Sequence, residues 1–129
     1  LYYQRMAKSL LTENKNTKYD FNNKTFRVIK NEGETAEVNE ETRFHFFQEK
    51  NILYAQYHGG LIKHGEFFGV ADGDSIHFYY EQENIHGKKN RGQSVDSINI
   101  LQNGKIQLID KWKWETKAGM GICILEELH

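Results

Sequence analysis

The sequence of 129 residues contains no proline and only one cysteine, Cys123. The absence of proline excludes proline-rich linkers and collagen-like repeats. The turns of the chain must therefore be made by Gly, Asn and Asp. A single cysteine excludes a disulfide scaffold and suits a reducing compartment. No apolar run approaches the ~20 residues of a membrane-spanning helix, and no signal peptide is visible. We therefore expect a cytoplasmic protein with no membrane partner.

An excess of charge of one sign is also missing, because 17 basic and 18 acidic side chains give a net charge of −1. Nucleic-acid-binding chains normally carry a basic excess, so we expect no nucleic-acid partner. Phosphate-loop and dinucleotide-binding motifs are lacking, and the 6 histidines show no recognisable metal-ligand spacing. We expect neither a cofactor nor a metal.

Aromatic residues, in contrast, are plentiful: 8 Phe, 7 Tyr and 2 Trp. They lie mostly beyond residues 1–18, which we interpret as an N-terminal extension; whether the residues before Met6 are native is left open. Within this extension Tyr3, Met6 and Leu10 share one helical face, which predicts a short helix. Residues 19–129 form a single predicted domain.

From residue 19 onward, short runs of β-branched and aromatic residues alternate with Gly, Asn and Asp, which is typical of strands and turns. The sequence predicts eight strands, over residues 26–29, 42–48, 52–57, 61–70, 75–80, 93–101, 105–114 and 121–128. Gly65 predicts a bend, since glycine inside a strand often marks a bulge or kink. Asp72-Gly73 predicts a tight hairpin turn, and Asn103-Gly104 predicts a type I′ turn.

No helical pattern lies between these strands, so the connections favour an antiparallel meander. Closing such a sheet on itself removes both exposed edges. We therefore predict an all-β fold, an eight-stranded antiparallel up-and-down barrel of the calycin kind. A two-sheet sandwich of the same strands is the alternative, which the short sequential connections disfavour.

The interior of an eight-stranded barrel holds either packed side chains or one small ligand. Period-2 alternation predicts inward faces that mix aromatic rings with a few polar groups, a composition typical of ligand pockets. The same rings could instead form a plain core. The candidate ligand-binding residues are Phe44, Phe46, Gln48, Tyr57, Phe78, Tyr80, Trp112, Trp114 and Glu126. Asp110 shares the predicted inward face of the two tryptophans.

These residues predict binding of a small hydrophobic or aromatic metabolite that carries one polar group. An isomerase- or cyclase-like enzyme is an alternative, with Glu126 as the candidate catalytic acid or base. A module that binds another protein, including a second copy as a homodimer, is a further alternative. The sequence does not distinguish which ligand is bound or whether a reaction is catalysed.

Several segments together carry a family resemblance: Thr42–Gln48, Tyr57–Gly60, Gly104–Leu108, Trp112–Trp114 and Glu126-Glu127. In these segments the chain resembles a family of small bacterial proteins, many of which are labelled N-acetylglutamate synthase. That activity needs an α/β fold with a Gly-rich loop at a helix N-terminus, which this sequence lacks, so we expect the label not to describe the chain. More distantly, the pattern is similar to the calycin group of lipocalin- and avidin-like barrels, which implies small-ligand binding.

Overall fold

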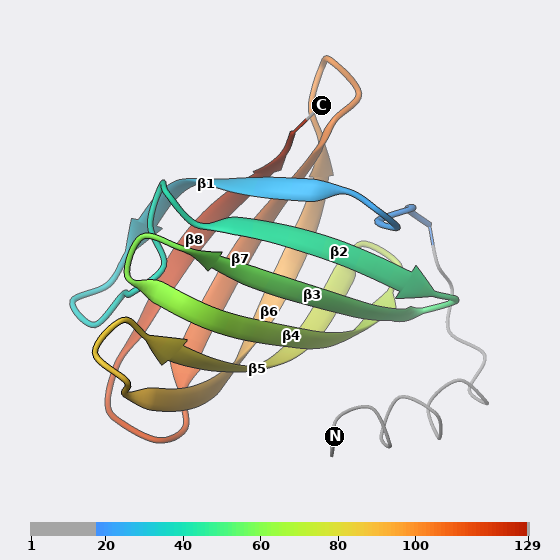
Figure 1. Ribbon diagram of the computed structural model, residues 1–129. Coiled ribbons are helices and arrows are strands. Elements are labelled where there is room, and N and C mark those ends of the chain that lie inside the picture. The colour runs from blue at the N-terminus through green and yellow to red at the C-terminus, as the bar shows by residue number, and fades with distance from the viewer. Residues whose placement is uncertain (1–17, 129) are drawn as a thin grey trace.

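Eight antiparallel strands follow one another around a closed barrel in the computed structural model, which describes residues 18–128 (Figure 1). The strands are β1 (Thr25–Glu32), β2 (Arg43–Glu49), β3 (Ile52–Gly59), β4 (Ile62–Asp72), β5 (Ser75–Asn84), β6 (Lys89–Ile100), β7 (Ile106–Trp114) and β8 (Met120–Glu127). Each strand pairs with its neighbours in sequence, and β1 pairs with β8 to close the barrel. The predicted all-β barrel is confirmed and the sandwich alternative is wrong. The helix predicted around Met6 lies outside the described residues.

Two strands, β5 and β6, extend into a segment that the sequence predicts as a polar loop. β5 continues four residues beyond Tyr80, and β6 begins at Lys89, which shortens the expected polar loop between them. These additions are rich in polar and charged residues, yet Gln82 and Asn84 are buried. Alternation of apolar with polar residues therefore could not reveal this part of the barrel.

The hairpin turns differ in detail from the prediction. Gly73 has a φ of 62° at the first central position of the β4–β5 turn, as a tight type II′ hairpin requires. At the β6–β7 turn only Gly104 has positive φ, at 84°, so the expected type I′ turn is wrong. There the amide of Gly104 donates to the carbonyl of Leu101, and the amide of Leu101 donates to the carbonyl of Lys105. Gly104 is therefore the left-handed residue of a longer hairpin.

An irregularity in β4 lies directly beside Gly65. Gly65 is opposite Tyr57 on one side and Gln82 on the other, and both ladders shift register between Gly65 and Ile62. A Cβ atom at Gly65 would collide with the ring of Tyr57. This glycine is required because an aromatic ring lies against the backbone.

Aromatic rings fill most of the barrel interior. The ring centroids of Phe46 and Phe78 lie 6.1 Å apart, and those of Phe67 and Phe78 lie 4.9 Å apart. Phe21, which precedes β1, lies 5.8 Å from Phe46 and plugs the end of the barrel where the β2–β3 and β4–β5 turns lie. The β1–β2 loop (residues 33–42) lies at the opposite end (Figure 1).

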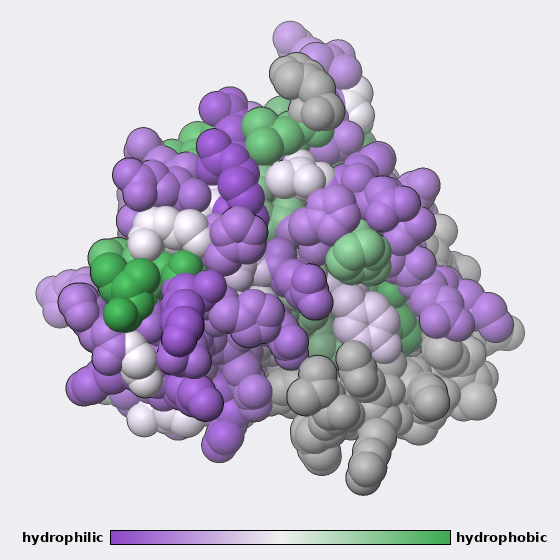
Figure 2. All heavy atoms as spheres, viewed as in Figure 1, coloured by the Kyte–Doolittle hydropathy of each residue, from purple (hydrophilic) through white to green (hydrophobic). Residues whose placement is uncertain are grey.

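The described surface on the viewed side is mainly hydrophilic, and its hydrophobic residues form small separate groups (Figure 2). Among residues 18–128 the structure contains no helix with the length and apolar character needed to cross a membrane.

Candidate functional site

The β1–β2 loop covers one end of the barrel and is held there by side chains from the barrel wall. Its Ala36 and Val38 pack against the core. Trp112 Nε1 donates a hydrogen bond of 2.9 Å to Asn31 Oδ1, at the end of β1, and Trp114 Nε1 donates one of 3.1 Å to Thr35 Oγ1 in the loop. Both indole N–H groups are therefore engaged where the loop closes the barrel.

Glu37 is the main polar anchor of this loop. Its carboxylate accepts hydrogen bonds from Gln82 Nε2 at 3.0 Å and from Asn84 Nδ2 at 2.6 Å. Tyr57 Oη in turn donates to Gln82 Oε1 at 2.6 Å. A buried polar network thus links Glu37 to two strands, and it explains why β5 ends in buried amides.

A cavity of about 30 Å³ lies beneath the β1–β2 loop, and we refer to it as the loop-end cavity. This volume accommodates only one or two groups of the size of water. Its walls combine aromatic rings with a few polar groups. It is lined by Asn31, Ala36, Glu37, Val38, Phe44, Phe67, Tyr80, Gln82, Asp110, Trp112, Trp114 and Cys123.

Two carboxyl groups are buried beside this cavity. Asp96 on β6 pairs directly with Asp110 on β7, and they are 0% and 3% exposed. We refer to them as the carboxyl pair. Ser94, two residues before Asp96, is 2% exposed. Among the described residues, the Ser94 hydroxyl, both oxygens of Asp96 and Oδ1 of Asp110 have no hydrogen-bond partner. Because buried polar groups are nearly always partnered, this cluster requires an explanation.

Burial disfavours the charged forms of the groups around the cavity. It raises the pKa of Asp96 well above its usual range, with the neighbouring Asp110 charge as a second cause, and it also raises the pKa of Asp110. Burial likewise raises the pKa of Tyr80 and of the Cys123 thiol. Two adjacent buried carboxyls disfavour ionisation of both, so the pair favours holding at least one proton. The raised pKa of Cys123 makes its thiol a poor nucleophile.

Four of the nine predicted ligand-binding residues line the loop-end cavity: Phe44, Tyr80, Trp112 and Trp114. Tyr57 is fully buried and reaches the same network through its hydrogen bond to Gln82. The structure therefore gathers these five residues at one end of the barrel.

Three further candidates lie toward the other end. Phe46 and Phe78 are fully buried among rings near the Phe21 plug. Gln48 accepts a hydrogen bond from the amide of Phe21 at 2.8 Å and donates one to the carbonyl of Lys50 at 2.7 Å. Its amide group therefore holds backbone segments together.

The expected inward orientation of Glu126 is wrong. On β8 the buried residues are Cys123 and Leu125, so Glu126 lies on the outer face. There it accepts a hydrogen bond from Gln107 Nε2 at 3.3 Å. The sequence does not fix the inward face here, because Ile122 and Ile124 form an alternating set as apolar as Cys123 and Leu125.

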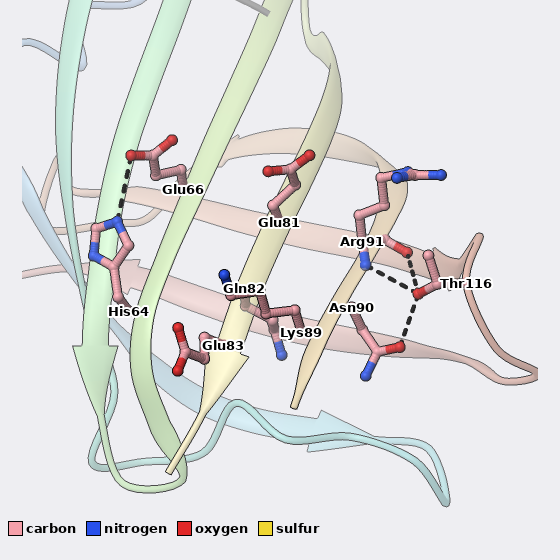
Figure 3. Close-up of a pocket in the computed structure, with 9 residues that line it drawn as sticks. All are labelled: His64, Glu66, Glu81, Gln82, Glu83, Lys89, Asn90, Arg91 and Thr116. Atoms are coloured by element: carbon pink, nitrogen blue, oxygen red, sulfur yellow. Dashed lines mark hydrogen bonds and ion pairs between the residues drawn. The ribbon is translucent and has the colours of Figure 1, made fainter. Parts of the chain in front are cut away.

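A second and larger concavity, of about 410 Å³, lies on the outer face of β4, β5 and β6 (Figure 3). In the β5–β6 ladder Glu81 lies opposite Arg91 and Glu83 lies opposite Lys89, while Glu66 on β4 lies opposite Glu81. Its lining is His64, Glu66, Glu81, Gln82, Glu83, Lys89, Asn90, Arg91 and Thr116. This open, charged groove lacks the apolar walls of a typical small-molecule pocket. Within residues 18–128, no group of three or more His, Cys, Asp and Glu side chains is arranged to hold a metal ion.

Sequence reasoning missed Asp96, Ser94 and Glu37. Asp96 does alternate in phase with Ile98, a pattern that could have placed it inside the barrel. Glu37 lies in a loop without periodicity, so no sequence signal places it against Gln82.

The closed barrel, its sequential strands and its aromatic end define a calycin-like β-barrel. A comparison with protein families agrees, because the model of the family described as "Avidin-like protein" matches residues 19–128. The chain belongs to this avidin-like family. Searches of the curated proteins and of the solved structures find no match.

Proposed function

We propose that the chain binds a small molecule at the loop-end cavity, between the aromatic wall and the β1–β2 loop. The observation that carries this proposal is the cluster of buried, unpartnered polar atoms beside an aromatic-lined cavity. Ligand pockets combine such apolar walls with a few placed polar groups. Membership of the avidin-like family supports the assignment.

The β1–β2 loop must move for a ligand to bind. The cavity holds about 30 Å³, whereas pockets for drug-sized ligands measure roughly 300–1,000 Å³. Much of the covering is supplied by loop residues Ala36, Glu37 and Val38, whose displacement would open the space above the tryptophans. The loop therefore acts as a lid whose side-chain hydrogen bonds are exchanged for contacts with the ligand.

The enzyme alternative loses its main support, because Glu126 lies on the outer face of β8. The binding function needs no general acid or base and depends on Phe44, Tyr80, Trp112 and Trp114 as apolar contacts. This favours a binding protein over an isomerase- or cyclase-like enzyme.

The two tryptophans provide a direct test, since both line the cavity and the chain has no other tryptophan. We expect benzyl alcohol or benzylammonium, added to the ¹⁵N-labelled full chain, to shift both indole N–H resonances in a saturable manner. Both signals should respond because the two N–H groups donate to Asn31 and Thr35, beside the loop that a ligand would displace.

The control is Gln48→Leu, at the plugged end, which should leave the indole response unchanged. Trp114→Phe should weaken it, because a wall of the cavity is altered. Indole resonances that do not respond to either probe would overturn the proposal.

A further inference from the structure

The Ser94 hydroxyl and the carboxyl pair form a cluster of hydrogen-bond acceptors inside the barrel. Asp110 reaches the loop-end cavity, Asp96 lies directly opposite it across the β6–β7 ladder, and Ser94 pairs with Trp112 in the same ladder. Their side chains are at least nine-tenths buried, and four of their oxygen atoms have no partner among the described residues. Among the described residues these groups are left to interact with one another inside the barrel.

Acceptors of this kind require a donor. Carboxylates accept hydrogen bonds and cannot donate them, so the protein supplies this cluster with only the Ser94 hydroxyl proton and any proton that the two carboxyls share. When the pair holds one proton, its remaining negative charge lies beside a wall of aromatic rings. Two rings of that wall, Trp112 and Trp114, have centroids 5.8 Å apart, and Tyr80 lies 5.6 Å from Trp114.

We infer that the ligand of this site is an organic monocation, a protonated amine or amidine attached to an apolar body. The single positive charge would lie against the carboxyl pair, and its N–H groups would donate to Asp110, the member of the pair that lines the cavity. Aromatic side chains favour such cations through the negative faces of their rings. This inference rests on the proposed binding function and adds the chemical class of the ligand.

The size of the cavity is consistent with a ligand that has a small cationic head group and a separate apolar body. A space of about 30 Å³ beside Asp110 is enough for a cationic head group, while the apolar body would occupy the room vacated by the β1–β2 loop. The position of the carboxyl pair on β6 and β7, away from the loop, keeps the charge fixed while the loop moves.

The test compares two probes of similar shape and different charge, benzylammonium and benzyl alcohol, by the indole N–H titration of the full chain. We expect benzylammonium to bind the wild-type chain about tenfold more tightly or better, as a charge-assisted hydrogen bond allows. Asp110→Asn should abolish this preference while retaining the affinity for benzyl alcohol. Asp96→Asn, which alters the pair without touching the cavity wall, should reduce the preference. Glu126→Gln, an outer-face carboxylate, is the matched control and should change nothing.

The outcomes separate the two proposals. Equal affinities of the two probes for the wild-type chain, or a preference that survives in both aspartate variants, would overturn the cationic ligand and leave the binding site intact. No indole response to either probe would overturn the binding site itself, and the cationic ligand with it.

Discussion

A buried carboxyl group whose polar neighbours are another carboxyl and a hydroxyl costs free energy, and Asp96 is such a group. Residues that lower stability in this way are typical of functional sites, where binding rather than folding explains their presence. Asp110 shares this environment and lines the cavity, where we expect its carboxylate to contact the ligand. At the scale of single residues, the proposed ligand binding therefore depends most on the carboxyl pair.

The free energy of unfolding should depend on pH through this pair. The native pKa values are raised, so the native chain keeps protons that the unfolded chain releases. The contribution to stability is therefore full below the ordinary aspartate pKa of 3.8 and is lost as pH rises through the native values. Asp96→Asn removes one raised pKa, and we expect it to increase the free energy of unfolding at about pH 8 by about 1–3 kcal/mol.

Urea unfolding of wild type and variant at about pH 4 and pH 8 measures this effect, and the difference between them should shrink at the lower pH. Glu126→Gln serves as the control. A destabilised Asp96→Asn chain at pH 8 would show that the aspartate is partnered and structural.

At the scale of elements, the β1–β2 loop is held by side-chain hydrogen bonds and by the packing of Ala36 and Val38, without a strand ladder. Glu37 accepts two of its hydrogen bonds, from Gln82 and Asn84. Regions held in this way open at lower free energy than the strands around them.

Glu37→Ala should release the loop without unfolding the barrel. We expect faster hydrogen exchange at residues 33–42, faster association of benzylammonium, and a loss of only about 1–3 kcal/mol in the free energy of unfolding. Hydrogen exchange detected by mass spectrometry provides the measurement. Glu34→Ala, an exposed change in the same loop, is the control. Unchanged exchange in Glu37→Ala would contradict the role of this carboxylate as the anchor.

The sequence predicts which face of a strand points into the barrel for some strands and not for others. On β7 the alternation of Leu108, Asp110 and Trp112 with lysines fixes the inward face, and the prediction there is confirmed. On β8 both alternating sets are apolar, and the sequence prediction places Ile122, Ile124 and Glu126 inside. In the structure Cys123 and Leu125 lie inside instead. Period-2 patterns identify a face only when the opposite face is polar.

At the scale of the whole molecule, the fold could be predicted because three sequence signals all indicate a β-meander. These signals are short apolar runs, glycine-containing turns and the absence of a helical period. The site could be predicted only in part. The aromatic wall follows from alternation, but the loop that closes it depends on long-range hydrogen bonds from Trp112, Trp114 and Gln82. No local pattern encodes such contacts.

Under the proposed function, the two ends of the barrel have different tasks, one structural and one for binding. Phe21→Ala removes the plug at the structural end, where the ring is buried against Phe26 and Phe46. We expect a loss of about 3–5 kcal/mol in the free energy of unfolding and, at temperatures where the variant is folded, no change in the preference for benzylammonium. Tyr19→Phe, which removes only an exposed hydrogen bond to Asp74, should cost far less. A plug variant with altered probe preference would show that the two ends are coupled.

The most direct test of the central claim is a crystal structure of the chain soaked with benzylammonium. The account predicts that the ammonium group lies within hydrogen-bonding distance of Asp110, that the ring lies against Trp112 and Trp114, and that the β1–β2 loop is displaced. A probe bound only in the outer groove between β4 and β6, with the loop-end cavity unchanged, would contradict it.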